Sequence, residues 1–127
     1  MSVRVLVVDD EADVEMLFRQ QFRRELREGR FVLDFAPSAD EALAKVRAAE
    51  GATIILLVSD INMPGMSGLD LLPRIKAERP DLPVLMVTAY GDANTHRIAM
   101  ERGADGFLTK PIDFASLRSK LHARLAA

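Results

Sequence analysis

Short apolar, largely β-branched runs alternate along this chain with segments whose apolar residues recur at helical spacing. The runs that we expect to be strands are Val3–Val8, Phe31–Phe35, Thr53–Ser59, Pro83–Thr88 and Gly106–Thr109. Three of them are nearly continuously apolar, which is typical of strands covered on both faces. Strand–helix alternation repeated five times predicts an α/β fold, with a parallel sheet and helices on both of its faces.

The segments between these strands carry helix signals. Two helical faces are formed by Val14, Leu17, Phe18, Phe22 and Leu26, and by Ala42, Leu43, Val46 and Ala49. Four residues or pairs mark helix ends: Ser38 with Glu41 as a capping box, Gly51 and Gly103 as C-cap glycines, and Asp113 as the N-cap of a last helix that runs to about Leu125. We therefore expect five helices.

Pro73 is unfavourable for the helix expected around it. It lies inside the expected helix Leu69–Ala77, where an interior proline costs about 3 kcal/mol or more. If this helix begins at Ser67, Pro73 lies past the first turn, and we expect a kink there.

Composition predicts one domain, residues 1–127, because this length suits a single core. The 17 basic and 19 acidic residues nearly balance, which argues against direct nucleic-acid binding. The chain has no cysteine, so disulfides and thiol nucleophiles are excluded. Its start is too short and too acidic for a signal peptide, and no apolar run approaches the roughly 20 residues of a membrane span. We expect a cytoplasmic protein that does not bind membranes.

Polar residues gather where the expected strands end. Asp9 and Asp10 follow the first strand, Asp60 follows the third, Thr88 closes the fourth and Lys110 follows the fifth. Open parallel sheets bind ligands outside the carboxyl ends of their strands, where the strand order reverses. With the flavodoxin-like order 2-1-3-4-5, the first and third strands are neighbours at that point. The three carboxylates would then converge on one cleft.

Three carboxylates that lie close together repel one another unless a cation joins them. An all-oxygen site favours Mg²⁺, Ca²⁺ or Mn²⁺ over Zn²⁺, and Mg²⁺ leaves room for a phosphoryl oxygen. Lys110 supplies a positive charge and Thr88 a hydroxyl for further phosphoryl oxygens. This is the set of groups that phosphoryl transfer needs, and Asp60 is the natural nucleophile.

Four segments carry a resemblance to a known family: VLVVDDE, LLVSDINMPGMSG, VLMVTAY and GFLTKP. Each lies at the end of an expected strand, and together they resemble the receiver domains of bacterial response regulators, of the chemotaxis-regulator type, over essentially the whole chain. The resemblance implies that Asp60 accepts a phosphoryl group from a phosphohistidine of a sensor kinase. It also implies that Mg²⁺ is bound directly by Asp10, Asp60 and the backbone carbonyl of Asn62, with Asp9 acting largely through water.

The same resemblance implies a switch. Lys110 and Thr88 would hold phosphoryl oxygens, and Phe107 would turn inward once Thr88 moves toward the phosphate. The Lys110–Pro111 bond would be cis. The surface formed by the helix after Gly91, the fifth strand and the last helix would then change its affinity for a downstream protein or a fused effector domain, or would support a homodimer.

Asn62 and Tyr90 lie two residues beyond Asp60 and Thr88, where side chains can flank the path of an attacking water. Tyr90 is bulky and is no general base near neutral pH, so we expect slow self-dephosphorylation. We do not expect an enzyme in the usual sense, since the domain would catalyse only its own phosphorylation and dephosphorylation.

Other functions fit less well. A haloacid dehalogenase-like phosphatase also uses an aspartate nucleophile and Mg²⁺, but it needs a second aspartate where this chain has Asn62. A nucleotide or flavin binder needs a glycine- or hydroxyl-rich loop where DDEADVE stands. A degenerate receiver that signals without phosphate is a third alternative.

We interpret His96 and His122 as ordinary surface or half-buried residues, and the basic stretch Arg19–Arg27 as a solvated helix face.

Overall fold

The computed structural model describes residues 2–89 and 92–126, and within these ranges the chain forms one five-stranded parallel sheet. The strands are β1 (Arg4–Val8), β2 (Val32–Ala36), β3 (Ile54–Asp60), β4 (Val84–Thr88) and β5 (Gly106–Thr109). Their order is β2-β1-β3-β4-β5, and all four neighbouring pairs are parallel. The expected flavodoxin-like order is therefore confirmed.

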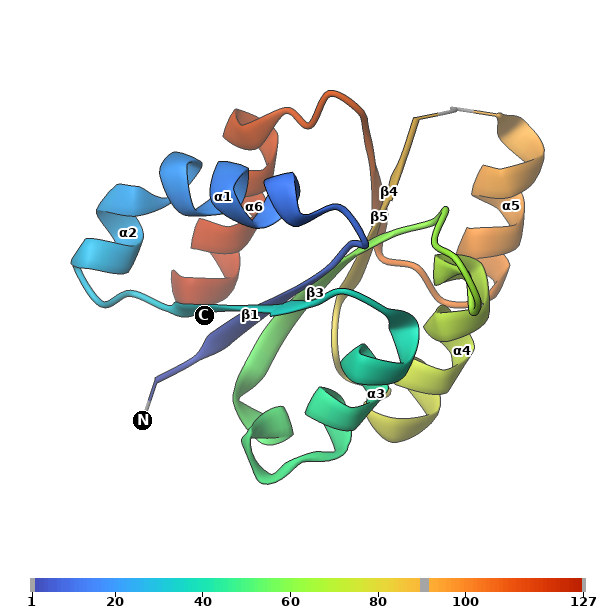
Figure 1. The fold of residues 1–127 in the computed structure, drawn as a ribbon, viewed down its shortest axis with the longest axis horizontal. Helices are drawn as coiled ribbons and strands as arrows, with labels where there is room; N and C mark the ends of the chain where they lie inside the picture. Colours follow the sequence, from blue (N-terminus) through green and yellow to red (C-terminus); the bar gives the residue numbers. More distant parts are fainter. Residues whose placement is uncertain (1, 90–91, 127) are drawn as a thin grey trace.

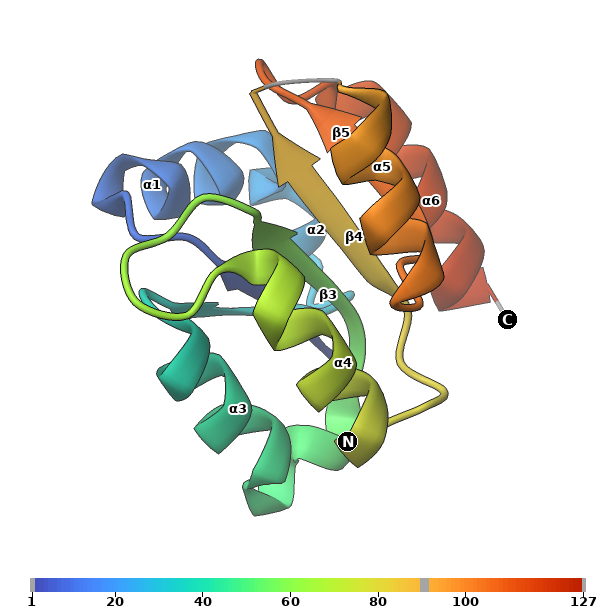
Figure 2. The same ribbon diagram turned by 90° about the vertical axis from the view of Figure 1, so that its right-hand side faces the viewer.

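Helices cover both faces of the sheet (Figures 1 and 2). The described residues form α1 (Ala12–Gln21), α2 (Arg23–Arg27), α3 (Ala39–Arg47), the short 3-10 helix η1 (Ala49–Thr53), α4 (Gly68–Glu78), α5 (Ala93–Glu101) and α6 (Phe114–Ala126). The first helical segment is not one helix, as its apolar face suggested, because the backbone at Phe22 leaves helical geometry with φ −106° and ψ 18°. This break gives six α-helices in the part of the chain that the structure describes, instead of five.

The strands separate two hydrophobic cores. Alternate residues of β1 point to opposite faces, so Val5 and Val7 pack in one core while Leu6 and Val8 pack in the other. One core lies under α1 and α6 and contains a cluster of aromatic rings, including the edge-on pair Phe18 and Phe114. The other lies under α3, α4 and α5. Burial on both faces explains why the strand sequences are nearly continuously apolar.

Most of the expected helix ends are confirmed. The Ser38 hydroxyl accepts a hydrogen bond from the Glu41 backbone N–H at 3.2 Å. Asp113 Oδ1 accepts hydrogen bonds from the backbone N–H groups of Ala115 and Ser116 in the first turn of α6. Gly103, with φ +102°, follows the end of α5. The expectation that Gly51 caps a helix is wrong, because α3 ends at Arg47 with Ala48 as its C-cap, and Gly51 lies inside η1.

Helix α4 begins directly after Ser67 and continues through Pro73. The Pro73 side chain is exposed on the outer side of the helix. The kink stays a prediction. No helix within residues 2–89 and 92–126 is long and apolar enough to cross a lipid bilayer.

A partly buried ion pair joins α2 to α6. Glu25 is only 5% exposed, and its Oε2 accepts a hydrogen bond from Arg118 Nε at 2.8 Å. Arg118 also donates to the Gln21 carbonyl oxygen, and His122 Nε2 lies 3.5 Å from the same Glu25 oxygen. Burial alone raises the pKa of Glu25, but the hydrogen bond and charge of Arg118 outweigh it and hold that pKa below its usual value. Glu25 therefore does not belong to a solvated helix face, although its neighbours Arg23 and Arg24 do.

We expect Glu25→Gln to lower the free energy of unfolding by about 1–3 kcal/mol at pH 7. A carboxyl whose pKa is lowered on folding stabilises the folded state above its unfolded pKa of about 4.3, and this contribution is lost as the pH falls through the folded-state pKa. The difference in free energy of unfolding between wild type and Glu25→Gln should therefore shrink below about pH 4. Denaturant unfolding of both proteins at pH 7 and pH 3 measures this difference. Glu28→Gln is the matched control, since Glu28 pairs with exposed Arg24; equal losses for Glu25→Gln at both pH values would contradict the prediction.

Candidate functional site

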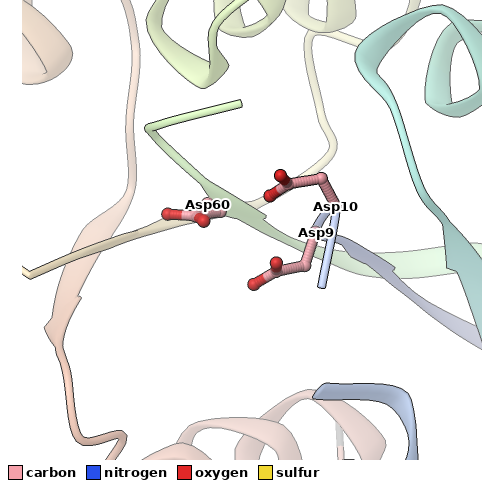
Figure 3. A group of neighbouring side chains, drawn as sticks. All are labelled: Asp9, Asp10 and Asp60. Carbon is pink, nitrogen blue, oxygen red and sulfur yellow. The ribbon is translucent and has the colours of Figure 1, made fainter. Parts of the chain in front are cut away.

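Three carboxylates converge at the carboxyl ends of β1 and β3. Asp9 and Asp10 follow the last residue of β1, and Asp60 is the last residue of β3. Because β1 and β3 are neighbours in the sheet, one carboxylate oxygen of each residue lies within 4.8 Å of the others. Figure 3 shows the three side chains pointing to the same side of the strand ends. Asp10 is exposed, Asp9 is partly buried and Asp60 is only 4% exposed.

The start of α4 packs against the backbone of Asp60 and Ile61. The chain turns after β3, and the Gly68 backbone N–H donates to the Ile61 carbonyl oxygen at 2.8 Å. A Cβ atom at Gly68 would lie 2.1 Å from the backbone oxygen of Asp60 and 2.9 Å from the Cα of Ile61. Only a residue without a Cβ allows this close approach. Gly68 therefore lets α4 pack directly against the end of β3, where the Asp60 side chain projects.

Lys110 brings a positive charge to Asp60. Its Nζ lies 3.2 Å from Asp60 Oδ2, and its backbone N–H donates to the Thr88 carbonyl oxygen at 2.9 Å. The Lys110–Pro111 peptide bond is cis, as expected. Burial by itself lowers the pKa of Lys110, but the hydrogen bond and charge of Asp60 raise it above its usual value. The ammonium group is therefore held at the acidic cluster in its charged form.

One ammonium group does not neutralise three carboxylates. Burial raises the pKa of Asp9, and the nearby charge of Asp60 raises it further, against the lowering effect of the hydrogen bond that Asp9 Oδ1 accepts from the Glu11 backbone N–H at 2.9 Å. Oxygen donors that are close together and carry an uncompensated negative charge fit a hard divalent cation. The exposed Asp10 leaves one side of the cluster open to solvent. The donor set is therefore suited to Mg²⁺.

Thr88 and Phe107 lie on β4 and β5, the two strands beyond β3 in the sheet. Thr88 is 3% exposed at the end of β4 and is paired with Thr109 of β5. Phe107 pairs with Met86, two residues before Thr88, so Thr88, Met86 and Phe107 share one face of the sheet. Phe107 is partly buried against the core under α3, α4 and α5, and its ring stacks on the ring of His96.

Asn62 and Tyr90 are the two remaining candidates from the sequence. Asn62 is exposed in the turn after β3, and ligation by its backbone carbonyl stays a prediction. Tyr90 lies outside the described residues.

The contact of His96 with Phe107 and the packing role of Gly68 were not predicted from the sequence, although Gly68 stands in one of the motifs that carry the family resemblance. A glycine at the start of a helix, where alanine would favour helix formation, was the signal that could have indicated this close approach.

The family model of the response regulator receiver domain matches residues 5–122. The chain belongs to this family. Over 123 residues this receiver domain is 36% identical to the two-component response regulator PhoP of Pseudomonas aeruginosa, covering 97% of this chain and 52% of the relative. It is 37% identical over 115 residues to the response regulator protein PilR of the same organism, covering 91% of this chain and 24% of PilR. The receiver domain thus spans about half or less of the length of these curated relatives.

Solved receiver structures have the same fold. The chemotaxis protein CheY4 of Vibrio cholerae superposes with a TM-score of 0.80 at 26% identity, covering 97% of this chain and 98% of that one. A CheY-like receiver domain protein from Methanospirillum hungatei gives a TM-score of 0.84 at 28% identity, covering 99% of this chain and 95% of that one. The resemblance noted in the sequence is therefore confirmed, and the chain is a receiver domain of a two-component response regulator.

Proposed function

We propose that this receiver domain is a Mg²⁺-dependent switch that accepts a phosphoryl group on Asp60. The observation that carries the proposal is the convergence on Asp60 of two further carboxylates, Asp9 and Asp10, and of the Lys110 ammonium group. Structural ion pairs seldom gather three carboxylates around one lysine, because the remaining negative charge repels itself. Phosphoryl transfer uses such an arrangement, since its catalysis depends mainly on positioning and charge stabilisation.

Mg²⁺ would be held by Asp10, Asp60 and the backbone carbonyl of Asn62, with Asp9 acting largely through water. When bound, the metal ion supplies positive charge to the oxygens of the transferring phosphoryl group. Gly68 packs closely against the backbone of Asp60, and this contact would hold the end of β3 in position before the phosphoryl donor arrives. Such positioning lowers the barrier because less freedom is lost in the reaction.

In the reaction, a carboxylate oxygen of Asp60 forms a bond to phosphorus while the phosphorus–nitrogen bond of a phosphohistidine breaks. The electron pair of the broken bond returns to the donor's imidazole nitrogen. Lys110, whose Nζ already lies 3.2 Å from Asp60 Oδ2, would exchange part of this contact for a phosphoryl oxygen. The Thr88 hydroxyl would bind another oxygen. The donor is a sensor histidine kinase or a phosphotransfer protein, and the encounter takes place in the cytoplasm.

The output follows from the movement of Thr88. As Thr88 turns toward the phosphoryl group, Phe107 moves inward, and the surface of α5, β5 and α6 changes shape. This surface would bind a downstream protein, a fused effector domain or a second copy of the domain. The domain itself binds neither nucleic acid nor membrane and is not an enzyme with an external substrate. Asn62, in the position where phosphatases of the haloacid dehalogenase class need a general acid, supports this distinction. Asn62 and Tyr90 would instead set the lifetime of the phosphorylated state.

Incubation with acetyl phosphate tests the proposal. We expect the intact mass of the wild-type protein to increase by one phosphoryl group when Mg²⁺ is present, and to stay unchanged when the metal is chelated. Asp60→Asn should remain unmodified under both conditions. A wild-type protein that is folded and binds Mg²⁺ but gains no mass would contradict the proposal, as would a gain that persists in Asp60→Asn.

Replacement of Phe107 by alanine tests the coupling. We expect Asp60 to reach the same final extent of phosphorylation, because Phe107 makes no contact with the phosphoryl group in the proposed reaction. The affinity for the downstream partner, measured by isothermal titration calorimetry, should no longer change on phosphorylation. A wild-type-sized change in partner affinity would rule out Phe107 as the coupling residue.

A further inference from the structure

The imidazole ring of His96 lies flat against the ring of Phe107. The two ring centroids are 4.3 Å apart, and the ring planes differ by 24°. His96 lies on α5 and is exposed, whereas Phe107 lies on β5 and is partly buried. One side of Phe107 packs on the core under α3, α4 and α5, and His96 stacks on its ring from the solvent side. The histidine is therefore in contact with the residue to which we assign the switch.

The backbone that carries His96 is fixed at the start of α5. Asp92 Oδ1 accepts a hydrogen bond from the Thr95 backbone N–H at 2.8 Å, and Asp92 Oδ2 accepts from the Thr95 hydroxyl at 2.8 Å. Arg97 is held within the helix by Asn94 Oδ1 at 2.7 Å and Glu101 Oε1 at 3.0 Å. These contacts secure the turn from which the His96 side chain projects. The stack is thus formed between a capped helix and a strand of the central sheet.

We propose that His96 is a positioning residue that holds Phe107 in its outward, partly exposed orientation and so sets the threshold of the switch. This inference rests on the proposed function, in which Phe107 moves inward when Thr88 approaches the phosphoryl group. The inward movement separates the two rings, so the stack stabilises only the unphosphorylated conformation. A contact present in one of two states shifts their equilibrium by its own free energy. For a stacked aromatic pair this shift is about 2- to 10-fold.

Loss of the stack should make phosphorylation easier. A larger fraction of the unphosphorylated protein would have Phe107 inward and Thr88 displaced toward the site, which is the conformation that binds the phosphoryl oxygens. We therefore expect His96→Ala to raise the initial rate of phosphorylation by acetyl phosphate in the presence of Mg²⁺ by about 2- to 10-fold. His96→Phe retains a flat ring and should restore a rate close to that of wild type.

Two controls separate positioning from a general effect on α5. Arg97→Ala changes the adjacent exposed residue, whose contacts are with Asn94 and Glu101, and should leave the rate unchanged. In a Phe107→Ala background, the additional change His96→Ala should have no effect, because the ring that it holds is missing. All rates are measured by intact mass, after circular dichroism has shown that each variant is folded.

The outcomes distinguish this inference from the proposed function. If the wild-type protein is not phosphorylated on Asp60, the proposed function fails, and the inference fails with it. If the wild type is phosphorylated and His96→Ala has the same rate, the proposed function stands and the positioning role is overturned. An acceleration that persists in the Phe107→Ala background would also overturn it, since His96 would then act by another route.

Discussion

Replacement of Lys110 by alanine is expected to slow the phosphorylation of Asp60 by about 100- to 1000-fold, the usual effect of removing one group that stabilises charge in a transition state. Lys110 Nζ lies 3.2 Å from Asp60 Oδ2, beside a carboxylate that is only 4% exposed. The attraction between this buried carboxylate and the ammonium group is screened less than it would be in bulk water, so the loss of the charge should have a large effect. The observed rate of mass increase with acetyl phosphate at a fixed Mg²⁺ concentration measures the effect.

Two variants make this test specific. Lys110→Arg keeps the charge, but its planar guanidinium group is larger and presents its donors differently, so we expect a partial loss of about 10-fold. Lys76→Ala removes another partly buried lysine, which pairs with Asp105 and donates to the Leu82 carbonyl oxygen, far from the strand ends that carry Asp60. Its phosphorylation rate should match that of wild type. A Lys110→Ala rate within about fivefold of wild type would contradict the assigned role.

Replacement of Gly68 by alanine is expected to lower the free energy of unfolding by about 2–3 kcal/mol. The new Cβ would lie 2.1 Å from the backbone oxygen of Asp60. Backbone atoms cannot rotate away as a flexible side chain can, so either the start of α4 or the end of β3 must move. Alanine is otherwise the better helix former by about 1 kcal/mol, which makes a net loss of stability diagnostic of the close contact.

The same substitution should also slow phosphorylation, by up to about 100-fold, because a displacement of roughly 1 Å at a reacting group has effects of this size. Gly29→Ala is the matched control: Gly29 has φ +71° with no atom near its absent Cβ, and it lies far from Asp60 in the loop before β2. It should lose about 1 kcal/mol of stability and keep its phosphorylation rate. Thermal unfolding and phosphorylation kinetics of both variants test the prediction. A Gly68→Ala protein as stable as wild type would show that the contact is easily relieved.

The strands of the sheet could be predicted because the signals that define each strand lie within a short stretch of sequence. Each strand is a short apolar run bounded by turn residues, and the observed strand bounds differ from the expected ones by about one residue. The meeting of Asp9, Asp10 and Asp60 followed from the strand order, since parallel neighbours end at the same edge of the sheet. Once the order is known, residues at strand ends become neighbours without any knowledge of side-chain packing.

Contacts between distant segments could not be predicted in this way. Glu25 and Arg118 lie 93 residues apart in the sequence, and their pairing depends on how α2 packs against α6. The contact of His96 with Phe107 likewise depends on the rotation of α5 over the sheet. The break at Phe22 was hidden because the apolar spacing continues across it, although the backbone does not. Periodicity shows which face of a helix is buried, but it does not show which residues of another element lie opposite.

The most direct test of the central claim is to locate the phosphoryl group in the chain. Borohydride reduces an aspartyl phosphate to homoserine, and peptide mass mapping of the protein treated with acetyl phosphate and Mg²⁺ then identifies the modified position. We predict homoserine at residue 60 and unmodified aspartate at residues 9 and 10. Reduction at Asp9 or Asp10, or no reduced residue in a sample whose intact mass had increased, would contradict the assignment of Asp60 as the phosphoacceptor.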